Sequence, residues 1–173
     1  APGEYRSART YRNLRDVVGA FAESMIGLQT YWYIEDLRSD NELWKNDPDK
    51  KFNPLPVYCG PGLWYEKRSG RIHARLAHTR IQNEKVSNYR GETDPRKLSL
   101  VVAPFGARAL YVDQAMHVRF QDLVLRGGGH NTVELNSGID VELDNVTIYA
   151  GSYGLRARGT GPMKFLNSAI HGN

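Results

Sequence analysis

Short runs of alternating apolar and polar residues dominate the second half of the chain. Val133-Glu134-Leu135 places one polar residue between two apolar ones, and Val141-Glu142-Leu143 and Leu155-Arg156-Ala157 do the same. Such alternation predicts strands with one buried face, because successive side chains of a strand point to opposite sides. The gaps between the runs hold Gly, Asn, Asp and Ser, which predict turns. We therefore expect many very short strands.

The runs repeat with a nearly fixed period. Three series of apolar pairs step by 23 and then by 22 residues: Leu110/Val112, Val133/Leu135 and Leu155/Ala157; Val118/Phe120, Val141/Leu143 and Met163/Phe165; Leu123/Leu125, Val146/Ile148 and Ser168/Ile170. Strands that recur in step predict a solenoid with three strands in each turn. One turn cannot bury its own pairs, whereas turns stacked about 4.8 Å apart form a continuous core.

Residues 110–173 resemble a right-handed parallel β-helix of the pectin-lyase-like type. In that family a two-residue bend, often containing Asn, joins two strands of each turn, which implies bends at Gln121-Asp122, Asp144-Asn145 and Leu166-Asn167. Asp and Asn suit such bends because they tolerate left-handed backbone. A leucine-rich repeat has a comparable period, but its units are denser in Leu and need a helix or an equivalent. The expected fold class is therefore all-β, with a right-handed parallel β-helix.

The first half of the chain lacks the repeat. We expect a non-repeating region over residues 1–97 and β-helix turns over residues 98–173, with Leu98–Ala103 as the first regular strand. The spacing of apolar residues in Asn13–Ile26 predicts a helix, and Thr30–Ile34 is typical of a strand.

A hairpin is predicted later in this region. Leu63–Glu66 and Arg71–Leu76 alternate as strands do, and Lys67-Arg68-Ser69-Gly70 forms a suitable loop with Gly in the left-handed position. The hairpin carries a second resemblance, because "PGLWY" followed by "SGRIH" is similar to the "PGxWYxDxxTGxxY" segment of bacterial carbohydrate-active β-helix proteins. Lys67 stands where Asp is usual and His73 where Tyr is usual. The resemblance implies a carbohydrate-active enzyme, with a glycoside hydrolase favoured.

The composition of the chain limits the classes of partner that it can bind. The chain has 173 residues with a net charge of +4, and its Lys and Arg residues are not clustered as in nucleic-acid-binding proteins. Its apolar runs are all too short to span a membrane. Cys59 is a lone cysteine, so no intrachain disulfide can form. We expect a polysaccharide or oligosaccharide partner, with no nucleic acid and no membrane.

The two ends of the sequence suggest a longer protein. The chain begins Ala1-Pro2-Gly3, without an initiator Met or a signal peptide, and stops at Asn173 before a further turn is complete. We expect the remainder of the β-helix, or another chain, to cover the open carboxyl-terminal end. The resemblance to bacterial β-helix hydrolases implies a secreted or periplasmic protein.

In the enzymes that the chain resembles, substrate lies in a groove over one sheet. That sheet corresponds here to Ala109–Asp113, Thr132–Asn136 and Gly154–Arg158, the strands that follow the glycine-rich connectors. Alternation then places two outward columns on it: Tyr111, Glu134 and Arg156; Asp113, Asn136 and Arg158. His130 and Tyr153 occupy equivalent positions just before two of the strands.

Several functions fit these columns. A glycoside hydrolase needs two carboxylates, and Asp113 and Glu134 are the catalytic candidates, with Cα atoms about 8 Å apart by strand geometry. A polysaccharide lyase would use Arg156 or Arg158 to neutralise a uronate and Tyr111, Tyr153 or His130 to move the proton. The β-helix could also be a non-catalytic module, either structural, as in a fibre or adhesin, or sugar-binding. Glu134 could then simply pair with Arg156 across turns. No cofactor is expected from this sequence, which lacks the dense Asp/Glu cluster of a Ca²⁺-dependent lyase, although further turns of the β-helix could supply a Ca²⁺ site.

Overall fold

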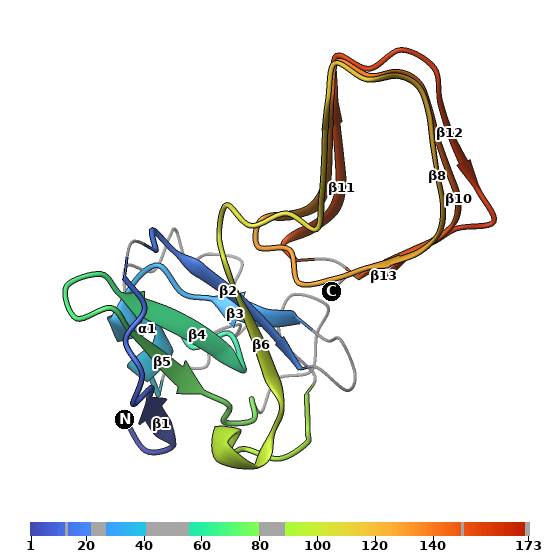
Figure 1. Ribbon diagram of the computed structural model, residues 1–173. Coiled ribbons are helices and arrows are strands. Elements are labelled where there is room, and N and C mark those ends of the chain that lie inside the picture. The colour runs from blue at the N-terminus through green and yellow to red at the C-terminus, as the bar shows by residue number, and fades with distance from the viewer. Residues whose placement is uncertain (13, 22–26, 41–55, 80–88, 150, 172–173) are drawn as a thin grey trace, which may run out of the picture. The chain divides into compact units, whose positions relative to one another are not determined.

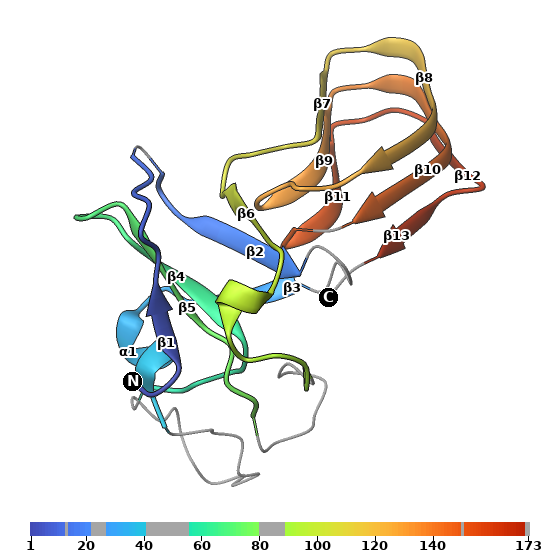
Figure 2. The same ribbon diagram turned by 60° about the horizontal axis from the view of Figure 1, so that its bottom comes forward.

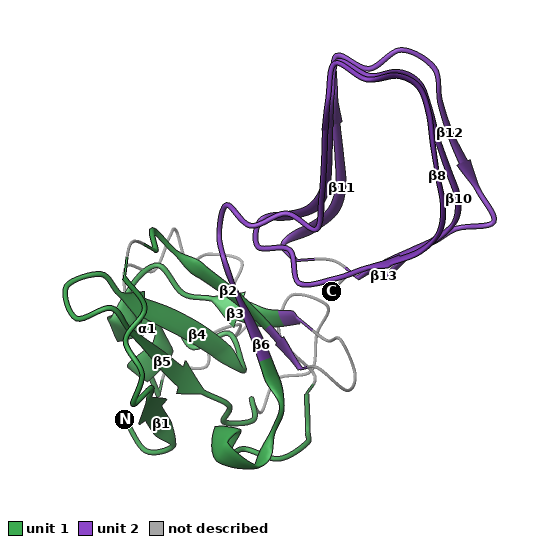
Figure 3. Cartoon of the chain, in the orientation of Figure 1, with its two compact units in different colours: residues 1–19, 28–100 green, residues 20–27, 101–173 purple. Residues whose placement is uncertain are grey.

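The computed structural model describes residues 1–12, 14–21, 27–40, 56–79, 89–149 and 151–171. The chain divides into two compact units, which are residues 1–19 with 28–100 (unit 1) and residues 20–27 with 101–173 (unit 2) (Figure 3). Strands make up most of the described secondary structure, and its helices are α1 (Ile34–Arg38) and the short 3-10 helix η1 (Pro95–Lys97) (Figure 1). The chain is all-β, as expected. The predicted domain limits at 97 and 98 stay a prediction.

Unit 1 is built on a twisted sheet. Its strands are β1 (Glu4–Arg6), β4 (Gly62–Glu66), β5 (Arg71–Arg75) and the greater part of β2 (Val17–Phe21) and of β3 (Gly27–Thr30), adjacent in the order β1-β5-β4-β3-β2. The predicted hairpin is confirmed, because β4 and β5 pair antiparallel with Trp64 opposite His73. Gly70 closes its loop with φ of 72°, in the left-handed region.

The helix predicted over Asn13–Ile26 is wrong where the structure describes it. Val17–Phe21 forms strand β2, and all five of its residues are buried. A strand buried on both faces presents a continuous apolar run, which periodicity does not distinguish from a buried helix. Gly19 lies at its centre, where an added Cβ would overlap the side chain of Leu63. Residues 13 and 22–26 lie outside the described residues.

Two further strand predictions need correction. The run Thr30–Ile34 is not a strand, because β3 ends at Thr30 and α1 begins at Ile34. The strand predicted at Leu98–Ala103 exists as β6 (Leu100–Pro104), but it lies in neither parallel sheet of unit 2 and is therefore not a strand of the repeat.

A buried arginine ties α1 to the sheet of unit 1. Arg75 Nη1 donates to the carbonyl oxygens of Leu37 (3.0 Å) and Ser39 (2.6 Å), at the end of the helix. Its guanidinium lies 4.3 Å from the ring centroid of Tyr58. Together with an ion pair to Asp40 over 3.1 Å, these contacts compensate the cost of burying the cation, because a buried charge needs pairing and hydrogen bonds.

Unit 2 consists of short strands that pair with their equivalents one repeat away. They are β7 (Leu110–Asp113), β8 (Met116–Leu125), β9 (Asn131–Asn136), β10 (Ile139–Tyr149), β11 (Tyr153–Arg158), β12 (Met163–Leu166) and β13 (Ala169–His171). One sheet has the order β11-β9-β7, and in the other β10 pairs with β8 on one side and with β12 and β13 on the other. All these pairings are parallel, and Figure 2 shows like strands side by side in successive turns.

The register confirms the predicted repeat. Val133 is the Cα partner of Leu110 on one side and of Leu155 on the other. Val141 is likewise the partner of Val118 and Met163. The offsets of 23 and 22 residues seen in the sequence are therefore the offsets between neighbouring strands.

The predicted bends also form. Asp122, Asn145 and Asn167 have φ of 59°, 52° and 47°, and two of the bends lie inside the long strands β8 and β10. Asn145 Nδ2 donates to Asp122 Oδ1 over 2.7 Å, so the bend residues also bond across turns. A second column of left-handed residues was not predicted: Gln114, Ser137 and Gly159, with φ of 52°, 51° and 55°. Gln and Ser rarely mark left-handed backbone, so their types gave no signal.

Stacking produces the core of unit 2. Its fully buried side chains all belong to β9 and β10, in the middle of the stack: Val133, Leu135, Val141, Leu143, Val146 and Ile148. Of the equivalent residues in the turn before, Val112 is buried and Leu110 and Phe120 are partly buried, whereas in the turn after Leu155 is partly buried and Phe165 is exposed. Each turn is therefore buried by its neighbours.

The glycine-rich connectors bring backbone against backbone. Gly129 N donates to Ala107 O over 2.9 Å, and Ser152 N donates to Gly129 O over 3.1 Å. A Cβ on Gly151 would overlap the carbonyl oxygen of Gly129, which cannot move away without breaking these bonds. Glycine is therefore required at this point of the stack by close approach.

We predict that Gly151→Ala lowers the free energy of unfolding by about 1–3 kcal/mol, because the added methyl group forces the stacked connectors apart. Urea unfolding followed by circular dichroism measures the change. Gly106→Ala is the matched control, since a Cβ there meets nothing within 4 Å and should alter stability by less than about 1 kcal/mol. Equal stability of both variants would show that the connectors are not closely packed.

Candidate functional site

The register gathers the predicted site residues on the sheet β11-β9-β7. Glu134 is the Cα partner of both Tyr111 and Arg156. Asn136 is the partner of both Asp113 and Arg158, so the two predicted columns exist. This surface, formed by the outward residues of β7, β9 and β11, is called the β9 face below.

An aromatic ladder borders the β9 face. The rings of His130 and Tyr153 meet edge to face with centroids 4.8 Å apart, and Tyr153 N donates to His130 O over 2.7 Å. Phe105 also stacks on His130, with centroids 4.4 Å apart. Sequence reasoning placed His130 and Tyr153 together but missed Phe105, which lies 25 residues before His130 and so outside the 23-residue step.

Exposure differs sharply along the face. Tyr111 and Tyr153 are 51% and 57% exposed, which is unusual for tyrosine rings, and Asp113 is also exposed. Glu134 is only 5% exposed, although alternation predicts an outward position for it. It lies beneath the surface because neighbouring polar side chains cover it.

Arg108 and Asn131 are the side chains that hold Glu134. Arg108 Nε donates to Glu134 Oε2, and Asn131 Nδ2 donates to the same oxygen over 3.2 Å. Among the described residues, the ion-pair partner of Glu134 is therefore Arg108, and not Arg156 as the cross-turn alternative expected. Neither Arg108 nor Asn131 was predicted, because no alternation extends into the connector before β7 and Asn131 precedes the apolar pair of β9.

These donors keep Glu134 ionised. The Arg108 guanidinium lowers the pKa of the Glu134 carboxyl below its ordinary value, against the opposing effect of burial, and the Asn131 amide adds to the lowering. A carboxylate held in this way accepts hydrogen bonds and is a poor proton donor.

The sheet of β8, β10 and β12 has an outward face of another kind. Arg119 Nε pairs with Glu142 Oε1 over 2.9 Å, and Lys164 Nζ lies 3.6 Å from Glu142 Oε2. Arg119 also bonds Asp144. These charges satisfy one another across turns, as in a solvated ion-pair ladder, and the imidazole of His117 in β8 is itself paired with Asp140 over 3.0 Å.

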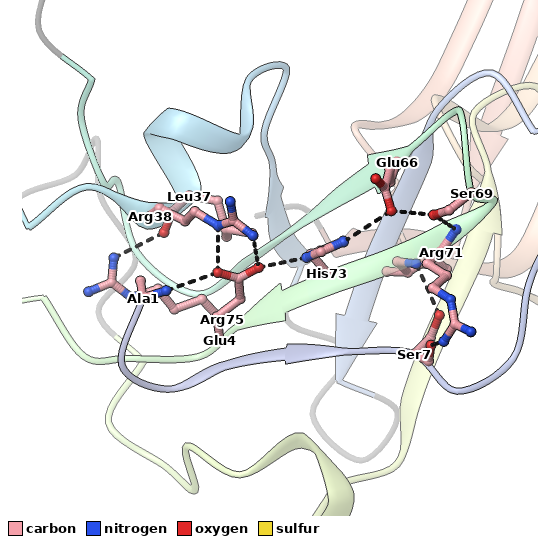
Figure 4. Close-up of polar contacts among 11 residues, drawn as sticks. Ala1, Glu4, Ser7, Leu37, Arg38, Glu66, Ser69, Arg71, His73 and Arg75 are labelled. Atoms are coloured by element: carbon pink, nitrogen blue, oxygen red, sulfur yellow. Dashed lines mark hydrogen bonds and ion pairs between the residues drawn. The ribbon is translucent and has the colours of Figure 1, made fainter.

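A second polar cluster lies in unit 1, around His73 (Figure 4). Its Nδ1 is 2.6 Å from Glu4 Oε1, and its Nε2 is 3.6 Å from Glu66 Oε2. Arg38 donates to both oxygens of Glu4, over 2.6 and 2.8 Å. Ser69 Oγ donates to Glu66. The cluster joins β1, β4, β5 and α1 through side chains that bond one another, which is typical of a structural network.

The described residues contain no group of three or more His, Cys, Asp or Glu side chains able to hold a metal ion. No helix in the described part of the chain is long and apolar enough to cross a membrane. The chain matches no protein-family model, no curated protein and no solved structure.

The polar cluster around His73 makes the free energy of unfolding depend on pH in the acid range. The hydrogen bond from Arg38 is the main cause that lowers the pKa of Glu4 from 4.5 to about 2, with His73 contributing. Because the folded pKa is depressed, the stabilisation is present above pH 4.5 and is lost as the pH falls towards 2.

We predict that Glu4→Gln is less stable than the wild type at neutral pH, and that the difference shrinks between about pH 4.5 and pH 2. All three tryptophans lie between residues 32 and 64, so tryptophan fluorescence during urea unfolding reports on this part of the chain. Glu35→Gln, at an exposed position of α1, is the control and should leave the pH dependence unchanged. Parallel curves for Glu4→Gln and wild type would contradict the network.

Proposed function

We propose that unit 2 is a right-handed parallel β-helix of the pectin-lyase-like type and that the chain is a carbohydrate-active enzyme that cleaves glycosidic bonds by hydrolysis. The proposal is supported by the 23- and 22-residue register and by the Asp and Asn residues at the bends. The hairpin segment Pro61–His73, which resembles that of bacterial carbohydrate-active β-helix proteins, precedes the repeat as it does in them.

The observation that carries the function is the composition of the β9 face. Exposed rings of Tyr111 and Tyr153 accompany carboxylate, amide and guanidinium groups on one sheet. Tyrosine offers an apolar ring with a polar end, which suits the alternately apolar and hydroxylated surface of sugars. Outward positions repeat about every 4.8 Å along the stack, close to the scale of a sugar ring. Successive turns can therefore contact successive parts of one sugar chain.

Two carboxylates supply the chemistry of hydrolysis. In this proposal Glu134, held ionised by Arg108, activates water or attacks the anomeric carbon, and the side chains that cover it move aside when a sugar binds. Asp113, exposed on the neighbouring column, donates the proton to the leaving oxygen. Asn136, Arg156, Arg158, His130 and Tyr153 bind the sugar chain on either side.

One observation favours a polysaccharide lyase as the second candidate. Arg156 and Arg158 make no ion pair with any described residue, although both belong to the β9 face. Uncommitted guanidinium groups can neutralise the carboxylate of a uronate and so ease removal of the adjacent proton. Tyr111, Tyr153 or His130 would then move that proton.

A panel of neutral and uronate-containing polysaccharides separates the candidates. Reducing ends that appear without the ultraviolet absorbance of an unsaturated uronate indicate hydrolysis, and reducing ends together with that absorbance indicate elimination. Binding to a polymer without either signal would make the chain a sugar-binding module and contradict the enzyme.

We predict that Asp113→Asn and Glu134→Gln each lower kcat about 100-fold or more on the polymer that is cleaved, because each removes a group that transfers a proton or attacks. Asp113→Asn should leave stability within about 0.5 kcal/mol, since the residue is exposed. Glu134→Gln should cost about 1–3 kcal/mol, since Arg108 loses its charged partner, so activity is measured well below the melting temperature.

Glu142→Gln is the matched control. Glu142 also lies in mid-strand and pairs with an arginine of the preceding turn, but on the ion-paired face of β8, β10 and β12. Its activity should equal that of the wild type. Full activity in all three variants would place the site away from the β9 face.

A further inference from the structure

We propose that Arg108 is a positioning residue of this site, which fixes Glu134 as an oriented carboxylate and couples it to the sugar bound at Tyr111. The inference rests on the proposed function and extends it to a residue outside the repeat. Arg108 lies in the connector before β7, at a position that no alternation or period indicates.

Arg108 and Asn131 together orient the Glu134 carboxylate. Glu134 Oε2 accepts from both Arg108 Nε and Asn131 Nδ2, and two donors on one oxygen restrict rotation of the carboxylate. Asn131 is 4% exposed, so this second donor is itself held in place by the surrounding structure. The carboxylate is therefore set in one direction before any ligand binds, as a nucleophile or base requires.

Arg108 also contacts Tyr111, on which the sugar is proposed to stack. The Arg108 guanidinium lies 5.1 Å from the ring centroid of Tyr111, in a cation–π contact. Its Nη1 donates to Gly106 O over 3.3 Å, within the same connector. Asn136 Nδ2 donates to the Tyr111 hydroxyl over 3.2 Å, so the exposed ring is fixed from both sides. A sugar that stacks on Tyr111 thereby lies next to the group that holds Glu134.

Arg108 is the charged side chain that contacts Glu134 directly. Arg108 faces it from the connector before β7, Tyr111 from β7, and Arg156 occupies the paired position on β11. His130 lies in the connector before β9, and Asp113 lies on the neighbouring column, opposite Asn136. The hydrogen-bond partners of Glu134 among the described residues include no carboxylate, so Glu134 shares no proton with another acid there.

The test begins without any substrate. Titration of the Glu134 carboxyl carbon by NMR should show a pKa below the ordinary value in the wild-type chain and a clear rise in Arg108→Gln. Arg108→Lys should fall between them, because it keeps the charge but cannot form the same directed bond. Arg119→Gln, which removes the arginine that holds Glu142 and Asp144, is the control and should leave Glu134 unchanged.

Kinetics on the most rapidly cleaved polymer of the panel give the second readout. Arg108→Gln should lower kcat at least about tenfold and move the acid limb of the pH profile to higher pH, with KM changed less than kcat. Arg108→Lys should restore part of kcat. A general loss of structure would instead change the circular dichroism spectrum of both variants and restore nothing in Arg108→Lys.

The outcomes separate the two proposals. A Glu134 titration that does not respond to Arg108→Gln overturns the positioning role, even if the polymer is cleaved. A titration that responds, in a chain that cleaves no polymer, supports the hold of Arg108 on Glu134 and overturns the hydrolase instead. An unchanged pH profile in an active Arg108→Gln variant also overturns the positioning role.

Discussion

Parallel hydrogen bonding in register is the constraint on which unit 2 depends. Each strand pairs with the strand one repeat away, at offsets of 23 and 22 residues, and all pairs in one turn must keep the same offset. Apolar pairs then lie over apolar pairs, which is why the inward apolar side chains of β9 and β10, in the middle of the stack, are fully buried. Left-handed residues lie over left-handed residues for the same reason, as at Asp122, Asn145 and Asn167. An insertion of one residue in any strand would turn its apolar side chains to the other face.

The same constraint builds the surface. It places outward side chains in columns whatever their chemistry, so the difference between two faces comes from the sequence alone. On the face of β8, β10 and β12 the columns hold charges that pair, with Glu142 between Arg119 and Lys164. On the β9 face the columns hold exposed tyrosine, an amide and guanidinium groups that form no ion pair with the described residues, beside a covered carboxylate. The first arrangement leaves little for a ligand to bind, whereas the second leaves donors, acceptors and rings available.

Most of unit 2 could be predicted because its strands alternate and its period is visible, so the partners of Val133 and Val141 follow from counting. The bends at Asn145 and Asn167 follow from residue type. Strand β2 could not be predicted, because a strand that is buried on both faces shows no alternation of apolar and polar residues.

The ion pair of Glu134 with Arg108 could not be predicted either, because Arg108 belongs to an irregular connector whose path no pattern records.

Isotope-labelled protein titrated with an oligosaccharide of the cleaved polymer most directly tests whether a sugar chain crosses the β9 face. The largest NMR shift changes should fall on Tyr111, Asn136 and Tyr153, while Glu142 and Lys164 stay unchanged. Equal or larger changes at Glu142 and Lys164 would contradict this site.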